Sequence, residues 1–338
     1  MDAVGLGALN VDRLYRVASL LQDGESFGDD FGEYPGGSAA NTIYALARLG
    51  MSTGFFGAVG DDPEGRLLLR SFTRAGTDTS GICVKRKART GIALAISDRQ
   101  GSRSLYIFPG ANSLLTASDV DMAVIGRCRL VHMSSFLGEG QQALQRELLD
   151  ALPQQAALSF APGLLYVVKG WQWLQPFLRR ASVVFMNGDE LGRLTGERLL
   201  PGIARCLEAG AGSVVVTLGA GLPLVGDERL GEAPDMEVVR APVPPGHGRD
   251  VRIVALVGRP DGCYLVEASI ARRGRLEATG AGDAFAAGFL FGYLEGKGPV
   301  ECGRLGHTEA SFMLTKPGAR SGLPNRAVLL NRVKSLFA

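Results

Sequence analysis

Short apolar runs that alternate with helical patterns constrain the fold of this chain more than any other feature. The runs are Ala3–Leu9, Thr53–Val59, Leu130–Ser134, Ala157–Phe160, Val183–Met186 and Val214–Leu218. Strands that are apolar almost throughout are buried on both faces, and strands that alternate with helices form parallel sheets. The sequence therefore predicts an α/β fold with a doubly wound, mostly parallel sheet flanked by helices.

Three segments depart from this pattern. Residues 82–108 read as strands of mixed polarity and residues 12–35 are largely polar, so we expect them to form a small β-stranded lid over one end of the sheet. Excursions of this kind often cover active sites. Residues 220–260 are proline-rich and are interpreted as an insertion or loop. With that interruption, residues 1–338 are predicted to form a single domain.

Composition argues against several classes of function. Lys+Arg number 36 against 34 Asp+Glu, so no strong overall field attracts nucleic acid or an anionic membrane. The 5 cysteines are far apart and form no CxxC, which argues against a disulfide framework or a zinc site. Because no secretory signal is visible and no apolar run reaches about 18 residues, we expect a cytoplasmic protein without a membrane span.

The stretch EATGAGDAFAAGF, residues 277–289, carries the clearest chemical signal. Gly280, Ala281 and Gly282 would present bare backbone N–H groups at a helix start, where the helix dipole also favours an anion such as phosphate. A carboxylate beside phosphate is costly, so Asp283 needs a reason to be there, such as accepting a proton from an attacking hydroxyl. Alternatively Asp283 only caps the helix. The segment alone does not decide between the two.

Asn10 and Asp12 follow the first predicted strand, where open α/β sheets bind ligands. A carboxylate accepts from two hydroxyls while an amide both donates and accepts, which suits a polyhydroxylated substrate. A plain polar turn is the alternative. The preceding GLGALN invites a nicotinamide-cofactor interpretation, but it lacks the third glycine of the dinucleotide fingerprint.

A glycine pair opens the next helix. Gly36 and Gly37 would let the backbone approach a ligand, and Asn41 lies in the first helical turn that follows. A glycine turn with Ser38 as a helix cap explains the glycines equally well, but leaves Asn41 without a role.

Two further strand ends could bind a nucleotide. Asn187 and Glu190, in NGDE, have the oxygen atoms that would meet a phosphate-bound Mg²⁺ through water, although Glu in a first helical turn also complements the helix dipole. Thr217 and Gly219 end another strand. The sequence contains no Walker, HExxH or catalytic-triad pattern, which argues against P-loop, metalloprotease and serine-hydrolase chemistry.

Taken in order, the motifs GALNVD, PGGSAANTIYALARLG, NGDE, VTLG and EATGAGDAFAAGF resemble those of the ribokinase-like, or PfkB, family of carbohydrate kinases. The resemblance extends from about Val4 to Pro324. It implies a Rossmann-like domain with a β-lid, which transfers the γ-phosphate of ATP to a hydroxymethyl group of a sugar or nucleoside. A homodimer formed through the lid is a further implication.

The resemblance also implies roles for single residues. Asp283 resembles the general base, and the amides of 280–282 resemble the anion hole for the phosphate in flight. Asn187 and Glu190 resemble the Mg²⁺ and phosphate motif. The sugar contacts would be Asn10, Asp12, Gly36, Gly37 and Asn41, and the nucleotide contacts would be Asn187, Glu190, Thr217, Gly219, Gly262 and His307.

Some features depart from the family pattern or leave alternatives open. Glu277 stands where the family's monovalent-cation loop usually has Asp, and Gly322 where Ser is common, which argues against K⁺ activation without excluding it. The absence of an obvious aromatic pair in the lid favours a sugar over a nucleoside. A protein that senses a sugar or nucleotide without turnover is the non-enzymatic alternative.

Overall fold

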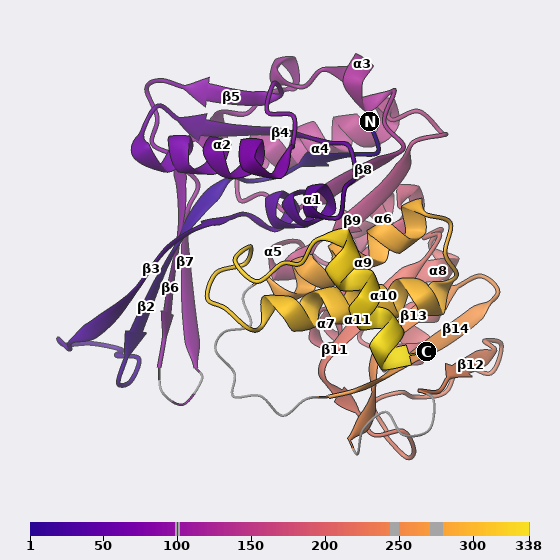
Figure 1. Ribbon diagram of the computed structural model, residues 1–338. Helices are drawn as coiled ribbons and strands as arrows, with labels where there is room; N and C mark the ends of the chain where they lie inside the picture. Colours follow the sequence, from indigo (N-terminus) through magenta and orange to yellow (C-terminus); the bar gives the residue numbers. More distant parts are fainter. Residues whose placement is uncertain (99, 101, 244–249, 271–279, 338) are drawn as a thin grey trace.

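The computed structural model, shown in Figure 1, describes residues 1–98, 100, 102–243, 250–270 and 280–337. Within these residues a ten-stranded sheet has the order β12-β14-β13-β11-β10-β9-β8-β1-β4-β5. The neighbouring pairs are parallel except at β13, which runs antiparallel to both β11 and β14. The strands are β1 Ala3–Leu6, β4 Thr53–Gly60, β5 Ile82–Lys85, β8 Leu130–Ser134, β9 Ala157–Ala161, β10 Val183–Asn187, β11 Val214–Leu222, β12 Val238–Ala241, β13 Val251–Arg259 and β14 Gly262–Ser269.

Helices cover both faces of this sheet, and each face has its own apolar cluster. One cluster includes Leu144, Phe177 and Ile203 under helices α4, α6 and α8; the other includes Ile43 and Leu290 under α1 and α9. Burial on both faces explains the continuous apolar runs of the strands. The helices are α1 Ser38–Arg48, α2 Pro63–Ala75, α3 Met122–Ile125, α4 Glu139–Ala151, α5 Gly163–Val167, α6 Trp171–Arg180, α7 Gly188–Thr195, α8 Leu199–Glu208, α9 Ala281–Leu294, α10 Pro299–Met313 and α11 Arg326–Phe337.

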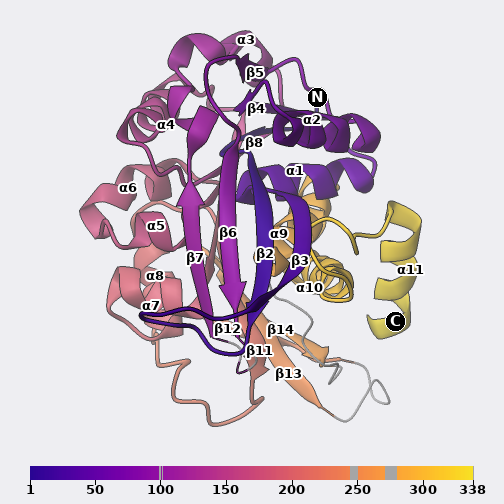
Figure 2. The same cartoon turned by 90° about the vertical axis from the view of Figure 1, so that its left-hand side faces the viewer.

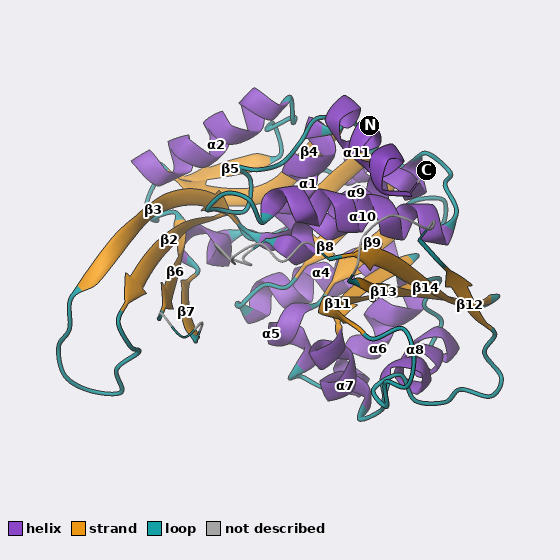
Figure 3. Cartoon of the chain, turned by 60° about the horizontal axis from the view of Figure 1, so that its bottom comes forward, coloured by secondary structure: helices purple, strands orange, loops and turns teal. Residues whose placement is uncertain are grey.

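A second sheet forms the lid, in the order β3-β2-β6-β7. Its strands are β2 Asn10–Val17, β3 Gly28–Gly36, β6 Gly91–Ser97 and β7 Arg103–Phe108. Figure 2 shows this sheet face on, and Figure 3 shows it curving away from the helical body. The fold class predicted from the sequence is confirmed, lid included. The boundary of the second lid segment differs. β5 pairs with β4 at the edge of the main sheet, so of residues 82–108 only those after β5 enter the lid.

The segment 220–260 also differs from the expected loop. Its last part is β13, whose residues Ile253–Gly258 are buried between β11 and β14. Its continuous apolar run, Ile253–Val257, was hidden by the proline-rich stretch directly before it. The first part crosses α8, where the carbonyls of Arg229 and Leu230 accept from the N–H groups of Leu199 and Leu200. Among the described residues, no helix has the length and apolarity needed to cross a membrane.

Candidate active site

Asp283 lies in the first turn of α9, and its carboxylate is bound by α1. Ser38 Oγ donates to one carboxylate oxygen at 2.7 Å, and Asn41 Nδ2 donates to the other at 2.9 Å. The residue that caps α9 is Gly280, and no side chain caps this helix. The interpretation of Asp283 as a mere cap is therefore wrong, because its oxygen atoms are directed across to another helix.

The ionisation of Asp283 reflects opposing effects. Burial raises the pKa of Asp283, while the hydrogen bonds from Asn41 and Ser38 and the positive charge of Arg320 lower it. Desolvation is the largest of these effects, and the pKa lies above its ordinary value. A carboxylate with a raised pKa is a better proton acceptor than an ordinary aspartate at neutral pH.

The backbone at the start of α9 is open where an anion would bind. The first helical hydrogen bond runs from the N–H of Ala284 to the carbonyl of Gly280, at 2.9 Å. The N–H groups before it lie in the turn that has no intrahelical acceptor. Gly280 has φ 85° and packs against Ala319, whereas a Cβ added at Gly282 would meet nothing within 4 Å. The part of the chain that the structure describes, which does not include the adjacent residues 271–279, therefore leaves space beside Gly282.

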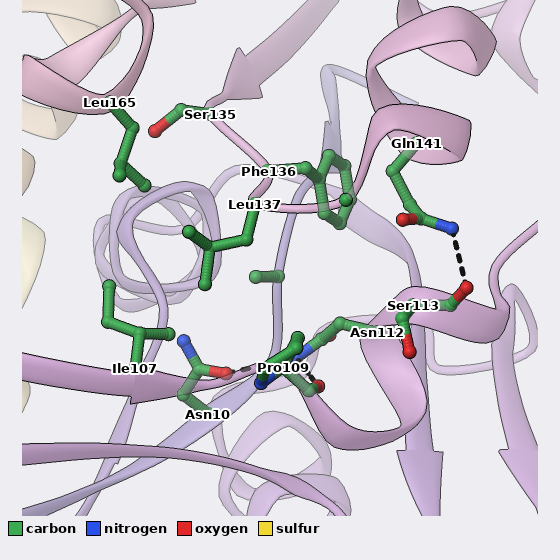
Figure 4. A pocket seen from close by; sticks show the side chains of 12 residues that line it. Asn10, Ile107, Pro109, Asn112, Ser113, Ser135, Phe136, Leu137, Gln141 and Leu165 are labelled. Carbon is green, nitrogen blue, oxygen red and sulfur yellow. Dashed lines mark hydrogen bonds between the residues drawn. The ribbon is translucent and has the colours of Figure 1, made fainter.

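The predicted sugar contacts meet at the root of the lid. Asn10 begins β2, and its Oδ1 accepts from Asn112 Nδ2 at 2.9 Å. The Asn10 amide lines a small cavity of about 40 Å³, whose walls include Ile107 of the lid and Leu137 after β8 (Figure 4). Asn112 was missed by the sequence reasoning, since only the fold brings it 102 residues back to Asn10.

The glycine pair lies where protein groups approach the backbone closely. A Cβ at Gly36 would overlap the Asp12 carboxylate, and a Cβ at Gly37, where φ is 98°, would overlap the carbonyl oxygen of Ala8. Both glycines are thus required by close approach of protein groups to one another. Asp12 is buried, and Gly36 leaves room for its carboxylate.

Asn41 connects Asp283 with a residue that the sequence reasoning missed. Its Oδ1 accepts from Arg320 Nε at 2.9 Å, and Arg320 also donates to the Gly36 carbonyl at 3.1 Å. Arg320 is only 7% exposed. Within GARSG it looks like an ordinary surface arginine after a turn, so no local signal distinguishes it.

On the opposite side of the site, Asn187 and Thr217 are direct neighbours across β10 and β11. Asn187 Oδ1 accepts from the Glu190 N–H at 2.8 Å, and the Glu190 carboxylate accepts from the Asn187 N–H at 2.9 Å. This reciprocal pair is a capping box. Burial raises the pKa of Glu190, and the charges of Asp189 and Asp283 raise it further. These carboxylates therefore lie close enough to repel one another.

Of the remaining predicted nucleotide contacts, Gly219 and His307 are compatible with the prediction, whereas Gly262 lies elsewhere. Gly219, with φ 56°, borders open space at the end of β11, and burial lowers the pKa of His307 on α10 to about 4, which keeps the imidazole neutral. Gly262 is not brought to the site. It pairs with Arg259 in the β13–β14 hairpin, beyond the end of β11 where Val214 pairs with Gly258. At about 3.3 Å per residue this is roughly 13 Å along the sheet from Thr217.

Two points concern bound cations. Among the described residues, no group of three or more His, Cys, Asp or Glu side chains is arranged to hold a metal ion. Mg²⁺ that binds mainly to phosphates and water does not need such a group. The mutual repulsion of Glu190 and its acidic neighbours fits a divalent cation at this position. The argument against K⁺ activation rested on Glu277 and Gly322; Glu277 lies outside the described residues, and Gly322 packs against the carbonyl of Phe312.

Comparisons with known proteins cover most of the chain. A family model described as pfkB family carbohydrate kinase matches residues 2–222 and 260–326 and leaves 223–259 unmatched. An uncharacterized sugar kinase of Archaeoglobus fulgidus is 32% identical over 282 residues, which are 82% of this chain and 98% of that protein. A ribokinase of Haemophilus influenzae is 25% identical over 95% of this chain and 94% of its own length.

Solved structures share the fold. A ribokinase from Thermotoga maritima has a TM-score of 0.77 and 21% identity, with 99% of both chains covered. The ribokinase of Arabidopsis thaliana complexed with ribose and ATP also has a TM-score of 0.77 and 21% identity, with 98% of both chains covered. At 21% identity, these two structures show that this chain shares their fold.

Proposed function

The chain belongs to the pfkB family of carbohydrate kinases, phosphotransferases with an alcohol group as acceptor, and we propose that it transfers the γ-phosphate of ATP to a hydroxymethyl group of a small sugar. The observation that carries this proposal is the carboxylate of Asp283, which lies beside the open backbone at Gly282. An acceptor for the hydroxyl proton and donors for the phosphate oxygens are thus side by side.

Asp283 would act as the general base. Its two protein bonds, from Ser38 and Asn41, leave lone pairs on both carboxylate oxygens for a substrate hydroxyl. The proton moves to the carboxylate as the hydroxyl oxygen attacks the γ-phosphorus, while the bond from that phosphorus to the β,γ-bridging oxygen breaks and ADP leaves. The N–H groups of residues 280–282 then stabilise the charge on the transferring phosphoryl group, because a helix N-terminus presents fixed donors to an anion.

The nucleotide would lie over the ends of β10 and β11. Thr217 and Gly219 would meet its phosphates, and the neutral His307 ring suits an adenine edge better than a charged one would. Glu190 and Asn187 would hold Mg²⁺ through water, and the ion would neutralise charge on the phosphate oxygens. The relatives described as ribokinases and the neighbour complexed with ribose and ATP support ATP and a sugar as the substrate pair.

The acceptor side favours a compact polyol. Asn10 and Asp12 offer a donor and acceptors, while Ile107 and Leu137 leave only a narrow cavity between them. A nucleoside kinase of the same family is the second candidate, and the same assay distinguishes the two.

The test is release of ADP by the purified chain against a panel of pentoses, hexoses, sugar phosphates and nucleosides, with Mg²⁺ present or chelated. We expect turnover with at least one sugar, and loss of turnover when Mg²⁺ is removed. Turnover with nucleosides alone would replace the sugar assignment. Binding of a sugar without any ADP release would contradict the proposed reaction.

We also propose a homodimer that uses the outer face of the lid. Asp12, Ala93 and Ile107 are cross-strand neighbours on the face toward the site, so Tyr106 and Phe108 point to the other face. These two rings are 53% and 55% exposed. Light scattering should give twice the chain mass, and Tyr106→Asp should reduce it; a monomeric wild-type chain would contradict the proposal.

A further inference from the structure

A single guanidinium group ties four segments together beside Asp283. Arg320, in the loop after α10, donates from Nε to Asn41 of α1, from Nη2 to the carbonyl of Gly36 at the end of lid strand β3, and from Nη1 to Ser71 Oγ of α2 at 3.2 Å. The side chain is almost fully buried. Burial of a charged arginine costs desolvation free energy even when its donors are bound, so this arrangement requires a compensating benefit.

The benefit is electrostatic and steric. Burial lowers the pKa of Arg320 to about 10, which still leaves it charged at neutral pH, and Asp12 and Asp283 oppose that shift. The guanidinium carbon lies 5.1 Å from the centre of the Tyr44 ring and 4.9 Å from that of Phe72. Both distances are within the range of a cation–π interaction. The guanidinium therefore lies at a fixed place between two buried or half-buried carboxylates.

The contact with Asn41 determines which way its amide points. An asparagine amide can turn its oxygen or its nitrogen toward a given neighbour, and the hydrogen-bond network decides. Because Arg320 Nε can only donate, it requires the oxygen of Asn41 on its side. The nitrogen is then directed at Asp283. The reversed amide would place its oxygen against the carboxylate and leave a donor facing a donor at Arg320.

We propose, on the basis of the kinase function above, that Arg320 is a positioning residue for Asp283, which fixes the orientation of the Asn41 amide and anchors the root of the lid through Gly36. The same contact set joins the lid to the base. A shift of the lid strand at Gly36 is therefore transmitted through one rigid side chain to the hydrogen bonds of Asp283.

Several charged groups determine the pH dependence that this arrangement predicts. Arg320 faces Asp283 from the loop after α10, Glu190 faces it from α7, and Asp12 and Tyr44 face Arg320 from β2 and α1. Arg320 is the cation among them, and it lowers the pKa of Asp283. Its removal should leave the carboxyl protonated up to a higher pH.

The test compares Arg320→Met and Arg320→Lys with Arg326→Met, a control at an exposed arginine paired with Glu295. We expect Arg320→Met to lower kcat/KM by about 10²-fold, the effect of a small misplacement of a reacting group, and to move the acid limb of its pH profile upward. Arg320→Lys should leave the acid limb near the wild-type position, because the charge remains, but should lower kcat, because an ammonium lacks the planar fork. The control should retain the wild-type profile.

A folded Arg320→Met protein with an unshifted acid limb would overturn the inference, since a merely structural role does not change that limb. If Arg320→Met does not fold, wild-type kcat in Arg320→Lys would overturn it equally. Asp283→Asn is assayed in parallel to separate the two claims. Normal turnover of Asp283→Asn would refute the base itself, whereas an inactive Asp283→Asn with an unshifted Arg320→Met profile refutes only the role of Arg320.

Discussion

The two sides of the site are constructed in different ways. Asp283 is bound by Ser38 and Asn41, which are 245 and 242 residues away along the chain. Asn187 and Glu190 are 3 residues apart and bind each other in a single helical turn. The base side thus exists only in the folded protein, while the Asn187 side is a local motif that any well-capped helix can form.

This difference has a consequence for function. On the base side the protein satisfies its own polar groups and leaves the carboxylate in one orientation, which is what a positioned proton acceptor requires. On the side proposed for the nucleotide, the described residues leave space beside Gly219, and Glu190 lies near other acidic groups. Changes on the first side should therefore affect chemistry, and changes on the second should affect nucleotide and metal binding.

The largest expected effect is that of Asp283→Asn. Loss of the base should lower kcat by about 10²- to 10⁴-fold, measured as ADP release with the best sugar of the panel. The thermal melt should not fall at neutral pH. Because the folded pKa of Asp283 is raised, the stability it contributes is present below its unfolded pKa and is lost as pH rises through the folded value. Unchanged turnover in this variant would contradict the assignment of Asp283 as the base, and with it the proposed difference between the two sides of the site.

Glu190→Gln should have the next largest effect. Glutamine keeps the capping box, so urea unfolding should change by less than about 0.5 kcal/mol. The Mg²⁺ concentration for half-maximal rate should rise by roughly 10- to 100-fold, as for residues that act through the metal's outer shell. Asp189→Asn, at the exposed neighbour, is the control. A loss of stability with unchanged Mg²⁺ dependence would show that Glu190 serves only the cap.

Gly36→Ala should lower both the stability of the protein and its affinity for the sugar. The added methyl group must displace the Asp12 carboxylate, so we expect a loss of about 1–3 kcal/mol of unfolding free energy and a higher KM for the sugar. Gly140→Ala is the matched control, because a Cβ there meets nothing within 4 Å. Equal behaviour of the two variants would mean that Asp12 does not require the space over Gly36.

The smallest effects separate two glycines that were both predicted to contact the nucleotide. Gly219→Ala forces a side chain into positive φ, 56°, and should cost roughly 1–2 kcal/mol. Gly262→Ala, at φ 143°, should cost more, because its Cβ would also lie 2.8 Å from the carbonyl oxygen of Glu237. Only Gly219→Ala should raise the KM for ATP, since Gly262 lies in the far hairpin. An equal rise in both variants would contradict the placement of the nucleotide over β10 and β11.

The limits of sequence reasoning follow the same division. The start of α9 at Gly280–Asp283 was predicted because glycine, alanine and aspartate have local conformational and charge preferences. Asn41 was expected to touch a sugar, yet its described bonds join Asp283 and Arg320. Arg320 itself could not be found, because the donors and acceptors around it come from segments 249–284 residues away.

The lid and the hairpin show the same limit. Ile82–Lys85 begins a segment of mixed polarity that suits a lid, but its pairing with β4 places it in the main sheet. The segment before β13 obscured a buried strand that only its partners β11 and β14 identify. Pairing is a property of two strands, and one strand's residues do not contain it.

By itself, the amino-acid sequence determined the alternation of strands and helices up to β11, the family of the chain and the position of the carboxylate at the start of α9. These depend on periodicity and on backbone preferences within a few residues. The tertiary structure alone decided what that carboxylate touches, which arginine lies behind it and which glycines serve the site. These depend on close packing between distant segments, where a single methyl group decides which atoms can meet.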